Sequence, residues 1–107
     1  MKYDPSYHSA LYTTRALLKF YEEHGSEFRA LRECLDALER MDRPIAEKMF
    51  RAIVRNNNLG DWWPPTVFSH ETPEYAQAVF EALLCHWLQL MRQLFKISND
   101  RRPAGSE

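Results

Sequence analysis

The sequence is poor in glycine and cysteine, and each shortage excludes a kind of chemistry. Three glycines among 107 residues are too few for a glycine-rich loop that cradles phosphates, so a nucleotide site of that type is excluded. The two cysteines, Cys34 and Cys85, form no C-x-x-C pair. Since no basic start followed by an apolar run opens the sequence, we expect a cytoplasmic protein with reduced thiols.

The sequence also lacks a strong charge of either sign and a long apolar run. Its 14 basic and 15 acidic residues leave a net charge of −1, which creates no general attraction for nucleic acid or an anionic membrane. The apolar stretch 82–91 is far shorter than the ~20 residues that a membrane span needs. The composition is that of a globular protein, and we expect one helical domain over 1–98 and a flexible tail over 99–107.

Motifs for catalysis or metal binding are absent as well. The four histidines form no H-E-x-x-H or H-x-x-x-H pair, and a zinc site needs three or four converging ligands. No G-x-S-x-G elbow occurs. Both cysteines fall inside helical patterns, where nothing activates a thiol. We therefore predict no catalytic residues, no metal and no cofactor, and a protein that is not an enzyme.

Apolar residues recur at helical spacing in four segments, which predicts an all-α four-helix bundle. Asp4-Pro5 starts the first helix and Gly25 ends it, and Ser26 is expected to cap the second. Thr72-Pro73 starts the last helix, expected to run to about Ser98 with apolar residues around half of its circumference. The predicted helices cover about 5–24, 27–40, 43–57 and 73–98.

Pro44 predicts a break or a kink between the second and third helices, because proline removes a hydrogen bond and clashes with the preceding turn. Asp42 is expected to cap the third helix. The alternative is one kinked helix, since the apolar pattern continues nearly in phase across the proline. The residues of the third helix expected to face inward are Ile45, Met49, Phe50, Ile53 and Val54.

A long connector, 59–71, joins the third and fourth helices and holds adjacent tryptophans, Trp62 and Trp63, before two prolines. Adjacent residues of an extended chain point to opposite sides. We therefore expect one tryptophan to cover the bundle and the other to contact a partner, and the pattern does not distinguish them.

The first helix carries a second stripe, Tyr12, Ala16 and Phe20, which points away from its main apolar face. In a lone bundle the two aromatic rings would be exposed, and an aligned exposed pair is typical of an interface. This stripe predicts binding of another protein or a two-fold homodimer, in which two copies pair through the back of the first helix or through the Trp62–Trp63 loop. The alternative is packing under the tail or the connector.

Lys48, Arg51 and Arg55 share one face of the third helix. Taken together, these patterns favour a non-enzymatic protein-binding module, such as an accessory regulator, inhibitor or adaptor, that uses the basic face, the tryptophans and the Tyr12–Phe20 stripe. The alternative is a nucleic-acid-associated regulator that uses the basic face. A third hypothesis is an enzyme whose site forms across a dimer.

Overall fold

The computed structural model describes residues 5–56, 59, 62, 64–65 and 70–96. Within this part the chain forms four α-helices and no strand, which confirms the all-α four-helix bundle. The helices are α1 (Pro5–Glu23), α2 (Arg29–Glu39), α3 (Arg43–Asn56) and α4 (Pro73–Leu94). The expected tail, 99–107, lies outside the described residues.

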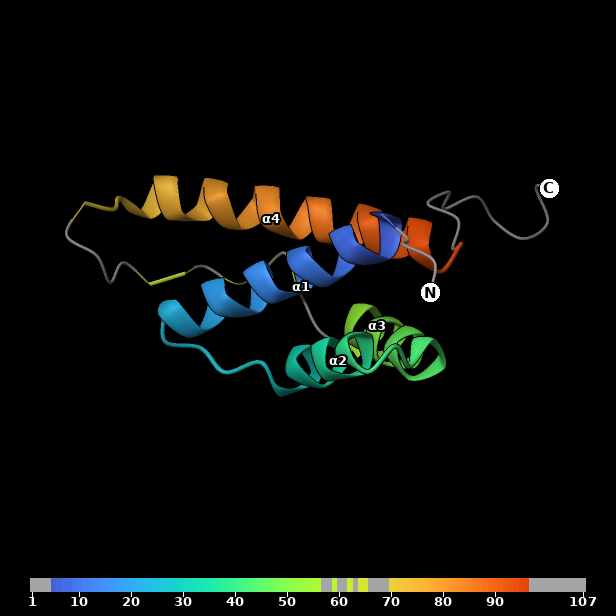
Figure 1. The fold of residues 1–107 in the computed structure, drawn as a ribbon. Coiled ribbons are helices and arrows are strands. Elements are labelled where there is room, and N and C mark those ends of the chain that lie inside the picture. The colour runs from blue at the N-terminus through green and yellow to red at the C-terminus, as the bar shows by residue number, and fades with distance from the viewer. Residues whose placement is uncertain (1–4, 57–58, 60–61, 63, 66–69, 97–107) are drawn as a thin grey trace, which may run out of the picture.

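The helices form two layers (Figure 1). The long helices α1 and α4 lie antiparallel in one layer, and the hairpin of α2 and α3 lies beneath the first half of α1. The Tyr7 hydroxyl of α1 donates to the carbonyl oxygen of Leu38, at the end of α2. The second half of α1 is covered differently, because Trp62 of the connector packs there against α1 and α4. Trp62 therefore covers this half of the bundle, where no helix of the described chain lies against α1 and α4 from below.

The end of α1 agrees with the sequence pattern, but the start of α2 does not. Gly25 has a φ of 83°, and the Ser26 amide donates to the carbonyl oxygen of Tyr21 at 2.8 Å, as in the usual glycine-terminated helix end. The prediction that Ser26 caps α2 is wrong. Its amide is already used in closing α1, and the N-cap position of α2 is Phe28, which makes no side-chain cap.

The break between α2 and α3 near Pro44 is confirmed, and the residue at which the chain turns is Met41 in the left-handed conformation. Met41 has a φ of 62°, while the Asp42 amide donates to the carbonyl oxygen of Ala37 at 2.8 Å. The Asp42 carboxylate accepts from the amide of Ile45 at 3.4 Å, so Asp42 caps α3 as predicted. The α2–α3 turn thus has the same hydrogen-bonded form as the end of α1. Met41 is strained in this conformation, because its Cβ comes close to the backbone carbonyl.

Replacing Met41 with glycine is expected to stabilise the protein by about 0.5–1 kcal/mol, since glycine adopts positive φ without the Cβ clash. Chemical denaturation measures the change. The matched control is Gly25→Ala at the equivalent position of α1. A Cβ there meets nothing within 4 Å, so only backbone strain acts and a loss of about 1 kcal/mol is expected. A change in the free energy of unfolding with the same sign for both substitutions would contradict this account.

The core lies between the two layers and is centred on Trp87 of α4. Its ring is fully buried, and its Nε1–H donates to the Thr14 hydroxyl at 2.8 Å. Thr14 in turn donates to the carbonyl oxygen of Ala10 at 2.7 Å. The buried residues of α4 form a narrower stripe than its apolar face, and partly buried side chains flank it. The buried residues are Ala76, Gln77, Phe80, Leu84, Trp87, Met91 and Leu94, and the flanking ones are Val79, Leu83 and Leu88.

Two details of α3 and α4 differ from expectation. Ile45 and Val54 were expected to face inward, but they are 40% and 38% exposed. The reason is that α3 packs chiefly against α2, so only a narrow stripe of Ala46, Phe50 and Ile53 is covered. The last helix ends at Leu94 and not near Ser98, because Lys96 takes a left-handed conformation with a φ of 57°.

Candidate functional site

The connector tryptophan that covers the bundle is Trp62. Its half-buried ring lies 4.6 Å from the Tyr21 ring and 4.9 Å from the Phe80 ring, measured between centroids. It thus packs between α1 and α4 and has the first of the two predicted roles, that of covering the bundle. Trp63 lies outside the described residues. The predicted partner contact of the second tryptophan stays a prediction.

The structure separates the two aromatic residues of the predicted α1 stripe. Tyr12 is 57% exposed, whereas Phe20 is only 8% exposed. Phe20 follows the alternative, packing under the connector, because its ring packs edge-on to that of the connector residue Trp62. Tyr12 instead neighbours His8, whose ring centroid is 5.2 Å away, and the Arg15 guanidinium, 5.5 Å from its centroid.

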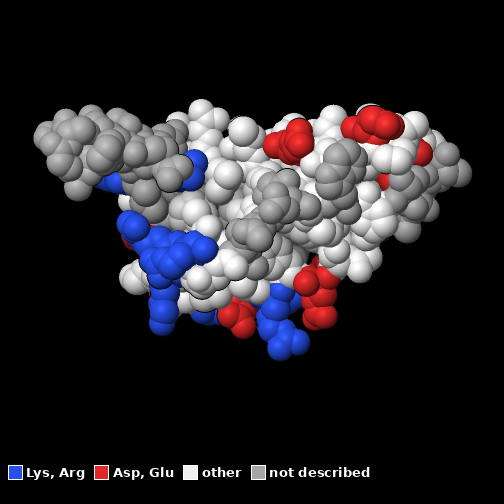
Figure 2. Space-filling model, turned by 180° about the vertical axis from the view of Figure 1, so that it is seen from behind, with Lys and Arg blue, Asp and Glu red and all other residues white. Residues whose placement is uncertain are grey.

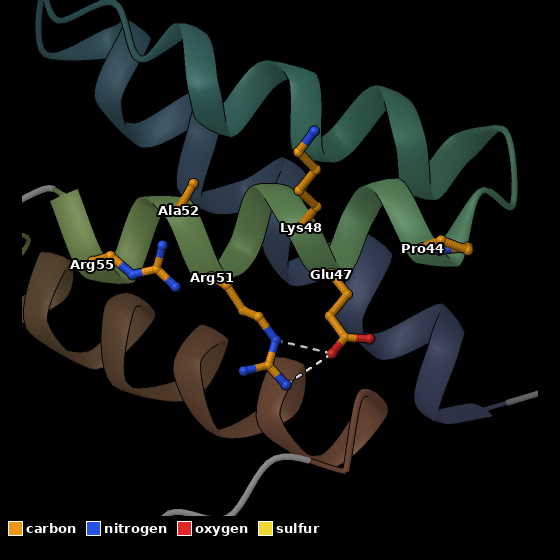
Figure 3. Close-up of a pocket in the computed structure, with 6 residues that line it drawn as sticks. All are labelled: Pro44, Glu47, Lys48, Arg51, Ala52 and Arg55. Atoms are coloured by element: carbon orange, nitrogen blue, oxygen red, sulfur yellow. Dashed lines mark hydrogen bonds and ion pairs between the residues drawn. The ribbon is translucent and has the colours of Figure 1, made fainter.

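The basic face of α3 is placed as predicted. Lys48, Arg51 and Arg55 are all exposed, and Figure 3 shows Lys48 and Arg51 pointing to opposite sides of the exposed face. Arg51 is engaged, since its Nε and Nη2 lie 3.0 and 2.9 Å from a Glu47 carboxylate oxygen. No described carboxylate lies within ion-pair distance of Lys48 or Arg55. The face therefore presents two cations whose charge nothing in the described chain neutralises.

A shallow, open hollow of about 410 Å³ lies along this face. Figure 2 shows Lys and Arg gathered at the end of the molecule where α3 lies, while Asp and Glu lie mainly toward the other end. The described residues that line the hollow are Pro44, Glu47, Lys48, Arg51, Ala52 and Arg55. Its openness suits a protein surface better than a small molecule, which binds in enclosed and mostly apolar pockets.

A buried ion pair is the feature that the sequence did not reveal. The Nε2 of His24, which follows α1, lies 2.8 Å from the Glu71 carboxylate, and the two side chains are only 2% and 6% exposed. The His24 Nδ1 lies 2.9 Å from the carbonyl oxygen of Phe20. A carbonyl only accepts, so Nδ1 carries a proton. The pair therefore ties the end of α1 to the residue before the N-cap of α4.

The electrostatic balance around His24 favours the imidazolium form. Burial is the largest influence and lowers its pKa, but the hydrogen bonds to Glu71 and Phe20 and the charges of Glu71 and Glu23 together raise the pKa above its ordinary value of 6.5. The Phe20 ring stacks on the imidazole with 4.1 Å between centroids. Both ring nitrogens are held in hydrogen bonds, so this histidine fastens two segments and is poorly placed to exchange protons with a substrate.

A hollow of about 320 Å³ opens beside this pair. Its described lining residues are Phe20, Glu23, His24, His70, Glu71, Tyr75 and Val79. A histidine at the end of a helix next to Gly25 is a local signal that sequence reasoning could have noted. Nothing local indicates its partner, because Glu71 is 47 positions away.

Of the two free cysteines, Cys34 is buried and Cys85 is exposed. Cys34 is fully buried, and burial raises the pKa of its thiol to about 12, so the thiol stays protonated. Among the residues that the structure describes, no group of three His, Cys, Asp or Glu could hold a metal ion. None of the helices in that part is long and apolar enough to cross a membrane.

Comparisons with protein-family models, with curated proteins and with solved structures found no match to this chain. A proposal on function therefore rests on the side chains of this chain alone.

Proposed function

We propose that this chain is a non-enzymatic protein-binding module of the cytoplasm, acting as a small regulator, inhibitor or adaptor through the exposed face of α3. The observation that carries the proposal is the pair of cations at Lys48 and Arg55, which no described carboxylate neutralises. The side chain of Ile45, which is 40% exposed, lies on the same face of α3, three residues before Lys48. Arginine is enriched at protein interfaces relative to the rest of the protein surface.

Binding of nucleic acid is the second candidate function. The three basic residues of the α3 face, Lys48, Arg51 and Arg55, favour it. Glu47 weakens this candidate, because it lies in the same hollow and is paired with Arg51. A polyanion on this face would meet that carboxylate. If three phosphates were neutralised, the logarithm of the binding constant would fall with the logarithm of salt concentration with a slope of about −2.7. An acidic protein surface needs fewer cations and is favoured.

The role of the face is tested with charge reversal. Lys48→Glu is expected to weaken capture of a partner by roughly tenfold, since it replaces attraction with repulsion at a contact. Immobilised protein would be exposed to extract, the captured protein purified, and its Kd measured directly. Lys19→Glu is the matched control, because Lys19 is an exposed lysine on α1 with 72% of its side chain accessible.

The expected pattern is a weaker complex for Lys48→Glu and an unchanged one for Lys19→Glu. Equal affinity of the two variants would show that the face of α3 is not the binding surface. Tight, sequence-dependent binding of duplex DNA that Lys48→Glu abolishes would favour the second candidate.

A further inference from the structure

The exposed face of α3 carries a stripe with the spacing of a helix–helix contact. Ile45, Lys48, Ala52 and Arg55 follow one another at intervals of three, four and three residues, so they share one side of the helix. This side is turned away from the core, which α3 meets through Ala46, Phe50 and Ile53. The small Ala52 between the two cations lets another backbone approach closely.

The first half of α4 carries a stripe of the same form and opposite charge. Glu74, Ala78, Glu81 and Cys85 are exposed and follow at intervals of four, three and four residues. Glu74 and Glu81 are the only acidic residues of α4, and neither forms an ion pair with a described residue. Tyr75, which is 57% exposed, adjoins this stripe, as Ile45 adjoins the cations of α3.

The two stripes match in length as well as in charge. Lys48 and Arg55 are seven residues apart, and so are Glu74 and Glu81. At about 1.5 Å per residue, each pair of charges spans about 10.5 Å along its helix. Each pair also has an alanine between its charges. Two such helices can therefore pack with both ion pairs formed at once.

The two stripes lie at opposite ends of one molecule. Figure 2 shows the basic end of this face over α3 and acidic residues near the start of α4 at the other end. A two-fold axis that lies in the plane of this face, perpendicular to the line between the two stripes, would place the basic stripe of each copy opposite the acidic stripe of the other. Such a contact closes on itself, and one surface then serves both subunits.

We propose that the partner of the α3 face is a second copy of this chain, with α3 of one protomer against α4 of the other in a closed two-fold dimer. This rests on the proposed function, since it names the acidic surface that α3 binds. It also moves the expected homodimer interface from the α1 stripe, where Phe20 is buried, to α3 and α4. Because exposed ion pairs hold it, the dimer weakens as salt rises.

A charge-swap experiment tests the dimer. The molar mass of the full chain at tens of micromolar is measured by light scattering for the wild type, for Lys48→Glu/Arg55→Glu and for Glu74→Lys/Glu81→Lys. The wild type is expected to be a dimer at low salt, and each double variant a monomer, with the dimer Kd raised at least tenfold. The first double variant has acidic residues on both the α3 and the α4 stripe, and the second has basic residues on both. Two copies of the same variant therefore bring like charges together and repel each other.

Mixing the two double variants is the decisive step. Both contacts of a mixed pair then join opposite charges, so the dimer mass is expected to return at a one-to-one ratio. Lys19→Glu serves as the control and should remain dimeric. A monomeric wild type would overturn the dimer, as would a dimer indifferent to both variants or a mixture that stays monomeric. The capture experiment with Lys48→Glu is read separately, so a monomeric wild type leaves the proposed function standing.

Discussion

Replacing Trp87 with alanine is expected to lower the free energy of unfolding by about 3–5 kcal/mol, the range for removing a large aromatic side chain from a core. Trp87 is fully buried, packs at 5.2 Å against the Phe50 ring, and donates to Thr14. The substitution removes contacts with both layers at once. For a domain of this size the melting temperature would fall by more than about 10 °C, and thermal unfolding followed by circular dichroism measures it.

Two further variants show how the effect of Trp87 is divided. Thr14→Val keeps the ring but leaves its buried N–H without the Thr14 acceptor, so a loss of about 1–3 kcal/mol is expected. Tyr12→Ala, an exposed aromatic on the same helix as Thr14, should change stability by less than about 0.5 kcal/mol. A Trp87→Ala variant no less stable than Tyr12→Ala would show that the core is not organised around this ring.

Replacing His24 with alanine is the second change with a large expected effect. It removes the ion partner of a Glu71 carboxylate whose side chain is only 6% exposed, and breaking a buried pair from one side typically costs about 3–5 kcal/mol. It also removes the ring that stacks on Phe20. Chemical denaturation near pH 6 measures the loss. A loss below about 1 kcal/mol would mean that the pair does not hold the connector to α1.

The contribution of His24 to stability should depend on pH with a definite sign. The pKa of His24 is raised in the folded protein above its unfolded value of 6.5, so the folded state binds the proton more tightly. The stabilisation is therefore fully present below pH 6.5 and is lost as pH rises through the raised folded pKa. His24→Gln cannot titrate and is the reference. The difference in unfolding free energy between wild type and His24→Gln should shrink as pH rises above 6.5, and an increase would contradict this sign.

Ring titration by nuclear magnetic resonance identifies the cause of the raised pKa. Glu71→Gln should lower the pKa of His24, because the charge of Glu71 is lost while burial, which lowers the pKa, remains. Glu23→Gln is the matched control, since Glu23 contributes only a weaker charge interaction. It should lower the pKa less than Glu71→Gln does.

The sequence by itself determined the helices and most of their ends, because these depend on neighbours a few residues away. Thr72 accepts from the amide of Tyr75 at 3.1 Å, and Gly25 takes the left-handed conformation, both as the pattern predicts. The exposed positions of Lys48, Arg51 and Arg55 also followed from helical periodicity. A helix period states which residues share a face without reference to the rest of the chain.

Only the tertiary structure decided which apolar faces are covered and which distant groups meet. Phe20 is buried where Trp62 packs against it, while Ile45 and Val54 are exposed because α3 is covered on one stripe only. The choice of Trp62 as the covering ring and the pairing of His24 with Glu71 both depend on where whole elements lie. Burial and ion pairing are properties of three-dimensional neighbours, and the order of residues along the chain does not specify those neighbours.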